Sequence, residues 1–254
     1  MAALTEVKVH LTKTFSRYIK GADIIYPFDI KSIKDVIPDC IIQWWVEPEN
    51  PASLSRNMAG PLMRVVGAPS IDGWSVALNE TNYIDSNINI SEFNGSDLTI
   101  IGITSSPGGK FNICGRLQVN APQRSRALLY DDVSNVAVRW LNASGAALRA
   151  GQAIATSGAD MHAARFVTNN GAGMISAKLT RPATKTTTET TGGASAYAMP
   201  SSNMLIGASA DGATAVTGKV YAVFAFKRAL TDSELSLIYT ICKNFYILNG
   251  GASL

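Results

Sequence analysis

The sequence predicts an all-β protein: a two-sheet antiparallel sandwich with one short C-terminal helix and an N-terminal arm. Many short segments rich in β-branched and aromatic residues follow one another at fairly even spacing. Turn dipeptides such as Asp72-Gly73, Asn94-Gly95 and Asn170-Gly171 separate them. Only residues 232–245 carry apolar side chains at helical spacing. A chain of 254 residues is long enough for one large sandwich.

Residues 1–38 differ in character from the rest and form the predicted arm. The segment is basic, its apolar residues have mixed spacing, and Pro27 and Pro38 interrupt it. We expect an arm that contacts a neighbouring subunit or a larger scaffold; a simple lead-in strand is the alternative. Residues 39–254 are expected to form the sandwich.

The expected strands begin at residue 40, where Trp44 and Trp45 face opposite sides of the first strand. The predicted strands are residues 40–46, 62–66, 74–78, 98–104, 111–119, 126–130, 136–140, 153–156, 163–168, 174–179, 185–191, 203–208 and 219–227.

The segment from Thr184 to Thr191 is threonine throughout, except for Lys185 and Glu189. Threonines at successive strand positions place hydroxyls on both faces, which is typical of a solvated edge strand or hairpin. An uncovered edge pairs readily with another chain. We therefore expect a homo-oligomer, a trimer or a dimer, with a contact at this edge.

The last strand, residues 218–227, is apolar on both faces, as in a strand packed on two sides. Its alternation places Val220, Ala222 and Phe224 on one face. A helix follows at once: Thr231 caps it, and Glu234, three residues later, completes a capping box.

This ending resembles the closing motif of concanavalin A-like (laminin-G-like) jelly rolls. The matching pieces are Leu205-Ile206-Gly207, Gly218-Lys219-Val220 and Arg228-Ala229-Leu230-Thr231-Asp232, within residues 203–240. Residues 82–86 are loosely similar to the family's opening strands. The resemblance implies a two-sheet antiparallel jelly-roll sandwich, a scaffold that hosts lectins, hydrolases and assembly modules.

The closing motif is similar to those of bacteriophage tail and other virion proteins. Charged residues make up only 16% of the chain, and no secretory signal is evident at its start. We therefore expect a non-enzymatic structural or adhesion component of a phage virion, folded in the host cytoplasm. It would contact other virion proteins and a cell-surface receptor or glycan. The alternatives are a capsid decoration (cement) protein, a stand-alone lectin and, in last place, a glycoside hydrolase.

Enzymatic activity is not expected, because glycosidases on this scaffold place two carboxylates on one face of a strand. Asp131 and Asp132 are adjacent and would point to opposite faces, and Glu189 stands alone among threonines. Asp160 and His162 would share a face of a strand and could hold a metal, but we favour the alternative that they are a pair at a loop end. Calcium is the ion that the resemblance implies, with five scattered candidate ligands and no matching motif: Asp85, Asp131, Asp132, Asp160 and Asp211.

Sugar binding requires an aromatic platform beside polar side chains, because a pyranose has an apolar face and a polar edge. Two regions combine these groups: Tyr130 with Asp131 and Asp132, and Trp140 with Asn142. Tyr197, in a loop of small residues, completes the candidate glycan platform. The alternative is that the aromatic residues belong to the core.

Bulk properties exclude two partner classes. The net charge of +3 is small and scattered, and so predicts no nucleic-acid surface. No apolar run approaches the ~18 residues that a membrane helix needs. Cys40, Cys114 and Cys242 are too widely spaced for a zinc site or a disulfide framework, and we expect free thiols.

Overall fold

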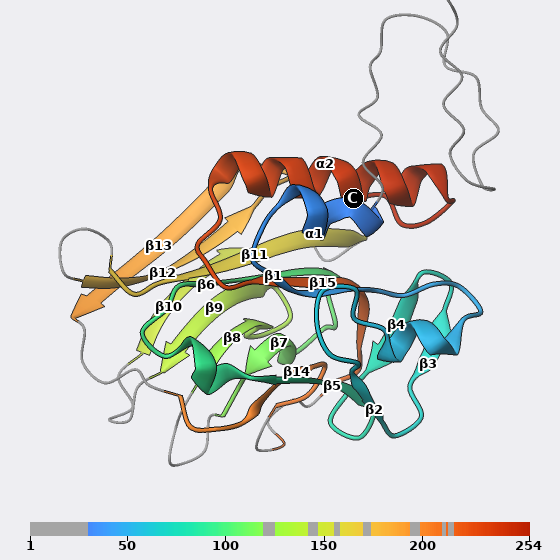
Figure 1. The fold of residues 1–254 in the computed structure, drawn as a ribbon, viewed down its shortest axis with the longest axis horizontal. Helices are drawn as coiled ribbons and strands as arrows, with labels where there is room; N and C mark the ends of the chain where they lie inside the picture. The colour runs from blue at the N-terminus through green and yellow to red at the C-terminus, as the bar shows by residue number, and fades with distance from the viewer. Residues whose placement is uncertain are drawn as a thin grey trace, which may run out of the picture.

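Two antiparallel sheets stack on each other, and a helical layer covers the outer face of one of them (Figure 1). The computed structural model describes residues 30–118, 125–141, 147–154, 158–169, 174–193, 199–209, 212 and 216–254. Within them the predicted two-sheet sandwich with one C-terminal helix is confirmed.

The sheet under the helices, sheet A, has eight strands. Its order is β13 (Thr186–Gly193), β12 (Met174–Arg181), β11 (Ala159–Val167), β6 (Leu98–Ser105), β15 (Gly218–Phe226), β4 (Ser75–Leu78) and β3 (Ser70–Asp72), with β1 (Cys40–Trp45) also paired to β15.

The opposite sheet, sheet B, has seven strands. Its order is β10 (Ala147–Ala153), β9 (Asn135–Leu141), β8 (Ser125–Tyr130), β7 (Phe111–Arg116), β14 (Asn203–Ile206), β5 (Tyr83–Asn89) and β2 (Arg64–Val66). Short 3-10 helices span Ile30–Ser32 (η1), Pro51–Ser55 (η2) and Ile90–Phe93 (η3), and the α-helices are α1 (Ile33–Val36) and α2 (Asp232–Leu248).

One predicted strand is misplaced. We expected residues 153–156, but β10 spans Ala147–Ala153. Leu148 and Ala150 are its inward-facing positions; Arg149 lies between them and Gly151 follows, so the apolar alternation is too short to recognise. Strand β3 has only three residues and was not predicted.

The apolar residues form two main layers. The larger lies between the sheets and contains Trp44, Phe111 and Phe166. The second lies between sheet A and the helices and contains Trp45 and Phe224. The two adjacent tryptophans therefore do face opposite sides of β1, because successive side chains alternate along a strand.

Strand β15 lies in the middle of sheet A and is apolar on both faces, as predicted, but its alternation is interrupted. A register shift between Val220 and Ala222 marks a bulge at Tyr221. Val220 therefore lies between the sheets, while Ala222 and Phe224 lie under the helices. The prediction that all three share one face is wrong, because periodicity does not reveal a bulge.

The described part of the predicted arm packs against sheet A. Ile30, Ile33 and Ile37 are buried in the helix-side layer. The Gln43 side chain on β1 donates hydrogen bonds to the carbonyls of Ile30 and Lys31, both at 2.9 Å, and accepts one from the backbone of Lys34. Residues 30–37 are thus part of the folded body. Residues 1–29 lie outside the described residues, and their role as a subunit contact stays a prediction.

Helix α2 begins with the predicted capping box. Thr231 Oγ1 accepts from the Glu234 amide at 3.2 Å, and the Glu234 carboxylate accepts from the Thr231 amide at 2.8 Å. Leu235, Ile238 and Cys242 recur on the buried side of the helix. None of the helices in the described segments has the length and hydropathy of a membrane span.

Candidate functional site

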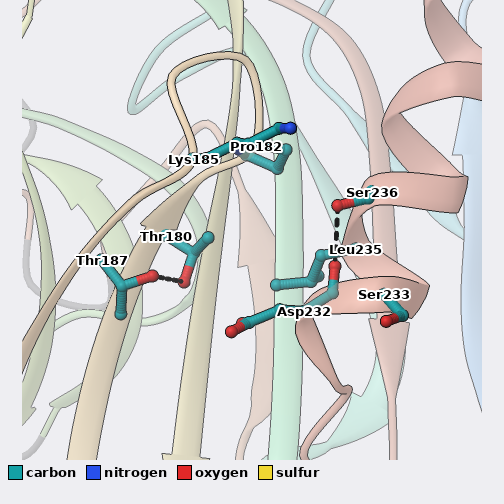
Figure 2. A pocket seen from close by; sticks show the side chains of 8 residues that line it. All are labelled: Thr180, Pro182, Lys185, Thr187, Asp232, Ser233, Leu235 and Ser236. Carbon is teal, nitrogen blue, oxygen red and sulfur yellow. Dashed lines mark hydrogen bonds between the residues drawn. The ribbon is translucent and has the colours of Figure 1, made fainter.

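A groove separates the β12–β13 hairpin from the first turn of α2 on the helix side of sheet A (Figure 2). Its volume is about 430 Å³. The lining side chains are mostly short and polar: Thr180, Pro182, Lys185, Thr187, Asp232, Ser233, Leu235 and Ser236.

The hairpin wall follows from strand register. Thr180 and Thr187 are directly opposite each other in the ladder, and their hydroxyl oxygens lie 2.9 Å apart. Lys185 closes the turn with a φ of 55°, a left-handed conformation that is uncommon for a residue with a side chain. Lys185 in the turn and Thr187 in the strand that follows both line the groove.

The two walls are joined by Arg165 of β11, which is largely buried. Its guanidinium donates to the Thr180 hydroxyl at 2.8 Å and to the carbonyl of Leu230 at 3.0 Å. It also pairs with the exposed Asp232 carboxylate at 2.7 Å. One planar guanidinium thus contacts the hairpin at Thr180, the chain before α2 at Leu230 and the first residue of α2 at Asp232.

A second arginine, Arg228, stabilises the first turn of α2. Arg228 forms two bonds to Glu234, at 3.0 and 2.6 Å. The Arg228 guanidinium, followed by the Thr231 cap, lowers the pKa of Glu234 to about 2. Glu234 therefore remains ionised at neutral pH and keeps the helix start in place.

The groove combines hydroxyl groups, one carboxylate and one ammonium group with the apolar surface of Leu235 and Pro182. In Figure 2, Asp232 and Leu235 point from the helix toward the hairpin. The groove is mainly polar, and its hydroxyl, carboxylate and ammonium groups can donate hydrogen bonds to, or accept them from, a small polar ligand.

The sequence-predicted glycan platform is wrong for its two described aromatics. Tyr130 is 1% exposed and Trp140 is 3% exposed, and both lie in the layer between the sheets. Trp140 lies against the Arg126 guanidinium, 4.7 Å from the ring centroid, and edge-on to Phe166. Tyr130 shares a hydrogen bond with Thr104. Neither ring can be a platform, because strand alternation turns both inward.

The polar members of that platform lie elsewhere. Asp131 pairs with Arg139 at 3.0 Å and also with Arg149. Asp132 organises the β8–β9 turn, where it accepts bonds from the Ser134 amide at 2.8 Å and from the Asn135 side chain. Asn142 and Tyr197 lie outside the described residues. The structure therefore does not bring the predicted set together.

The calcium candidates do not fit a calcium site. Asp85 pairs with Arg64, Asp131 with two arginines and Asp160 with Arg181. In these three aspartates the carboxylate oxygens that a calcium ion would need are bonded to arginines, and Asp132 accepts hydrogen bonds within its own turn. In the described part of the chain, no three His, Cys, Asp or Glu side chains are grouped to hold a metal; Asp211 lies outside it.

The groove was not predicted from the sequence, although the two segments that line it, the threonine-rich strand and the start of the C-terminal helix, were. The threonine-rich segment ends at Thr191 and the helix cap is Thr231, forty positions later in the sequence. Only the packing of α2 on sheet A brings Thr187 and Asp232 to one cavity.

Comparison with known proteins shows the fold. The receptor binding domain of botulinum neurotoxin D matches with a TM-score of 0.54 at 12% identity, over 82% of this chain and 53% of that one. The botulinum neurotoxin serotype C1 binding domain matches with a TM-score of 0.53 at 10% identity, over 82% and 52%. The chain thus spans about half the length of these structures. No family model and no curated protein matches it.

Proposed function

We propose that this chain is a non-enzymatic adhesion module of a bacteriophage virion, which uses its lectin-like sandwich to bind a cell-surface receptor or glycan and to assemble with virion proteins. The observation that carries the binding role is the groove between the β12–β13 hairpin and α2. Its hydroxyls and carboxylate can hydrogen-bond sugar hydroxyls, and Leu235 and Pro182 can contact an apolar sugar face.

Two further observations support the proposal. Structures described as receptor-binding domains of toxins share the sandwich. At 12% sequence identity, this similarity concerns the fold only. The closing motif, Arg228 to Asp232, resembles those of phage tail-associated proteins, and its last residue, Asp232, lines the groove.

The candidate catalytic carboxylates are engaged in other roles, which favours a binding function over hydrolysis. A general acid of a glycosidase needs a raised pKa. The hydrogen bond from the Ser134 amide lowers the pKa of Asp132 instead. Asp131 is paired with two arginines and Glu189 with Lys178.

A glycan array with matched variants tests the binding role. Asp232→Asn removes the groove's carboxylate charge, and Asp72→Asn is the control: an equally exposed aspartate, paired with Lys219 at the other end of sheet A. A lost hydrogen bond to a charged group costs about 1.5–3 kcal/mol, so affinity should fall ~10- to 100-fold for Asp232→Asn only. Unchanged binding by Asp232→Asn, or no bound glycan at all, contradicts the groove as the site.

The virion role is tested separately by immunogold labelling of phage particles released from cells that carry the gene. Label on the tail supports an adhesion module, and label over the head supports decoration of the capsid. Particles without label contradict the virion role.

A further inference from the structure

Strand β13 is the terminal strand of sheet A, and β12 alone pairs with it among the described strands. Most of its residues are exposed. A terminal strand of eight residues has a row of backbone groups available to a further strand. It contains no proline, its turn residue Lys185 is charged at one end, and Glu189 lies in its middle.

Side-chain contacts fix which residues share a face of β13. Thr187 reaches the Thr180 hydroxyl and Glu189 pairs with Lys178, so both point to the helix side of sheet A. Thr186 and Thr188 point to the inner side, where the Thr186 hydroxyl donates to the Gln152 side chain of β10 and the Thr188 hydroxyl accepts from it. Lys185 lines the groove and therefore also lies on the helix side.

We propose that two copies of this chain pair antiparallel through β13, with the two-fold axis at Thr187, so that Lys185 of each copy faces Glu189 of the other. An antiparallel edge-to-edge pair has its two-fold axis perpendicular to the sheet, which keeps the helix side of both copies on one side. Directly opposite residues must then share a face, as in any antiparallel ladder.

This condition leaves few registers. An axis at Lys185 or at Glu189 would place like charges opposite each other, which is destabilising. An axis at Thr186 or Thr188 would leave both charged residues opposite uncharged ones. The axis at Thr187 alone forms two Lys–Glu pairs, with threonine opposite threonine between them.

Pairing in this register has a consequence for the groove. Thr187 belongs both to the groove and to the shared edge, and Lys185, in the turn just before β13, also lines the groove. The two grooves would meet at the axis and form one longer channel, to which each copy contributes one half. This part rests on the proposed binding function, whereas the pairing itself does not.

Charge exchange tests the pairing in the full chain. Sedimentation should show a dimer whose dissociation constant rises at least ~10-fold in Lys185→Glu, because two attractive pairs become repulsive. The double variant Lys185→Glu with Glu189→Lys should restore the dimer. A monomeric wild type, or a dimer insensitive to Lys185→Glu, overturns the proposal.

A cysteine test fixes the register. In a Cys40→Ser background, Thr187→Cys should form a disulfide-linked dimer on mild oxidation, because residues opposite each other at the axis have Cα atoms about 4.5–5.5 Å apart. Thr191→Cys is the matched control and should remain uncrosslinked, since its copies lie eight positions apart. Equal crosslinking by both variants overturns the register. A dimer that binds no glycan would refute the proposed function and leave the pairing intact.

Discussion

Burial of His162 should make the free energy of unfolding fall at acid pH, and replacing His162 with glutamine should remove most of that loss. His162 lies between the sheets, fully buried. Its Nε2 is 3.4 Å from the Tyr130 hydroxyl, which in turn is 2.9 Å from the hydroxyl of Thr104. Burial, reinforced by Arg181 and opposed by Asp160, lowers the pKa of His162 from 6.5 to about 4.

The sign and size of the effect follow from that difference. Above pH 6.5 the imidazole is neutral in both the folded and the unfolded chain, and His162 imposes no proton-linked cost. Below pH 6.5 the unfolded chain binds a proton that the folded chain does not, so the free energy of unfolding falls as the pH falls. At ~1.4 kcal/mol for each pKa unit, the loss approaches about 3 kcal/mol at pH 4.

Urea unfolding of the wild type and of His162→Gln at several values between pH 7.5 and pH 4 measures this loss. Titrations of groups remote from His162 are common to both proteins and cancel in the difference. The stability difference between wild type and variant should therefore shift by about 3 kcal/mol in favour of the variant between pH 6.5 and pH 4. A difference that does not change with pH would show that His162 binds its proton as readily in the folded chain as in the unfolded one, which contradicts the effect of burial.

Three further perturbations test the packing. Deletion of residues 1–37 removes the buried Ile30 and Ile33 and should give insoluble or unfolded protein, as read by circular dichroism; a folded product would contradict this. Arg126→Ala should lower the free energy of unfolding by about 3 kcal/mol in a urea titration. The substitution opens a cavity and leaves the carbonyls of Phe93 and Ser96 without the guanidinium donors that lie 2.7 Å away. A loss below about 1 kcal/mol would contradict this. Glu234→Gln should cost about 1 kcal/mol at neutral pH in the same assay, and the difference from wild type should disappear only as the pH falls from 4.5 toward 2, the pKa range of that carboxylate.

The fold was largely predictable because its signals are local. Thr231 and Glu234 form their capping box within four residues, and the alternation of Trp44 and Trp45 is a property of any strand. The bulge at Tyr221 was not predictable in this way, because it depends on how β15 pairs with β6.

The site was much less predictable. Tyr130 and Trp140 fulfil the sequence pattern of a sugar platform, yet both occupy inward positions and serve as core. Burial of an aromatic side chain depends on which face of its strand packs against the other sheet. The residues next to it in the sequence do not identify that face.

The amino-acid sequence by itself determined the class of the molecule: alternating strands, an edge rich in threonine, and a capped helix after a strand apolar on both faces. Tertiary structure alone decided which polar groups share a cavity. Arg165 joins Thr180 to Asp232 across fifty-two positions of the chain because α2 must cover the apolar outer face of sheet A. Periodicity is encoded within a few residues, whereas a groove exists only once hydrophobic burial has brought distant segments together.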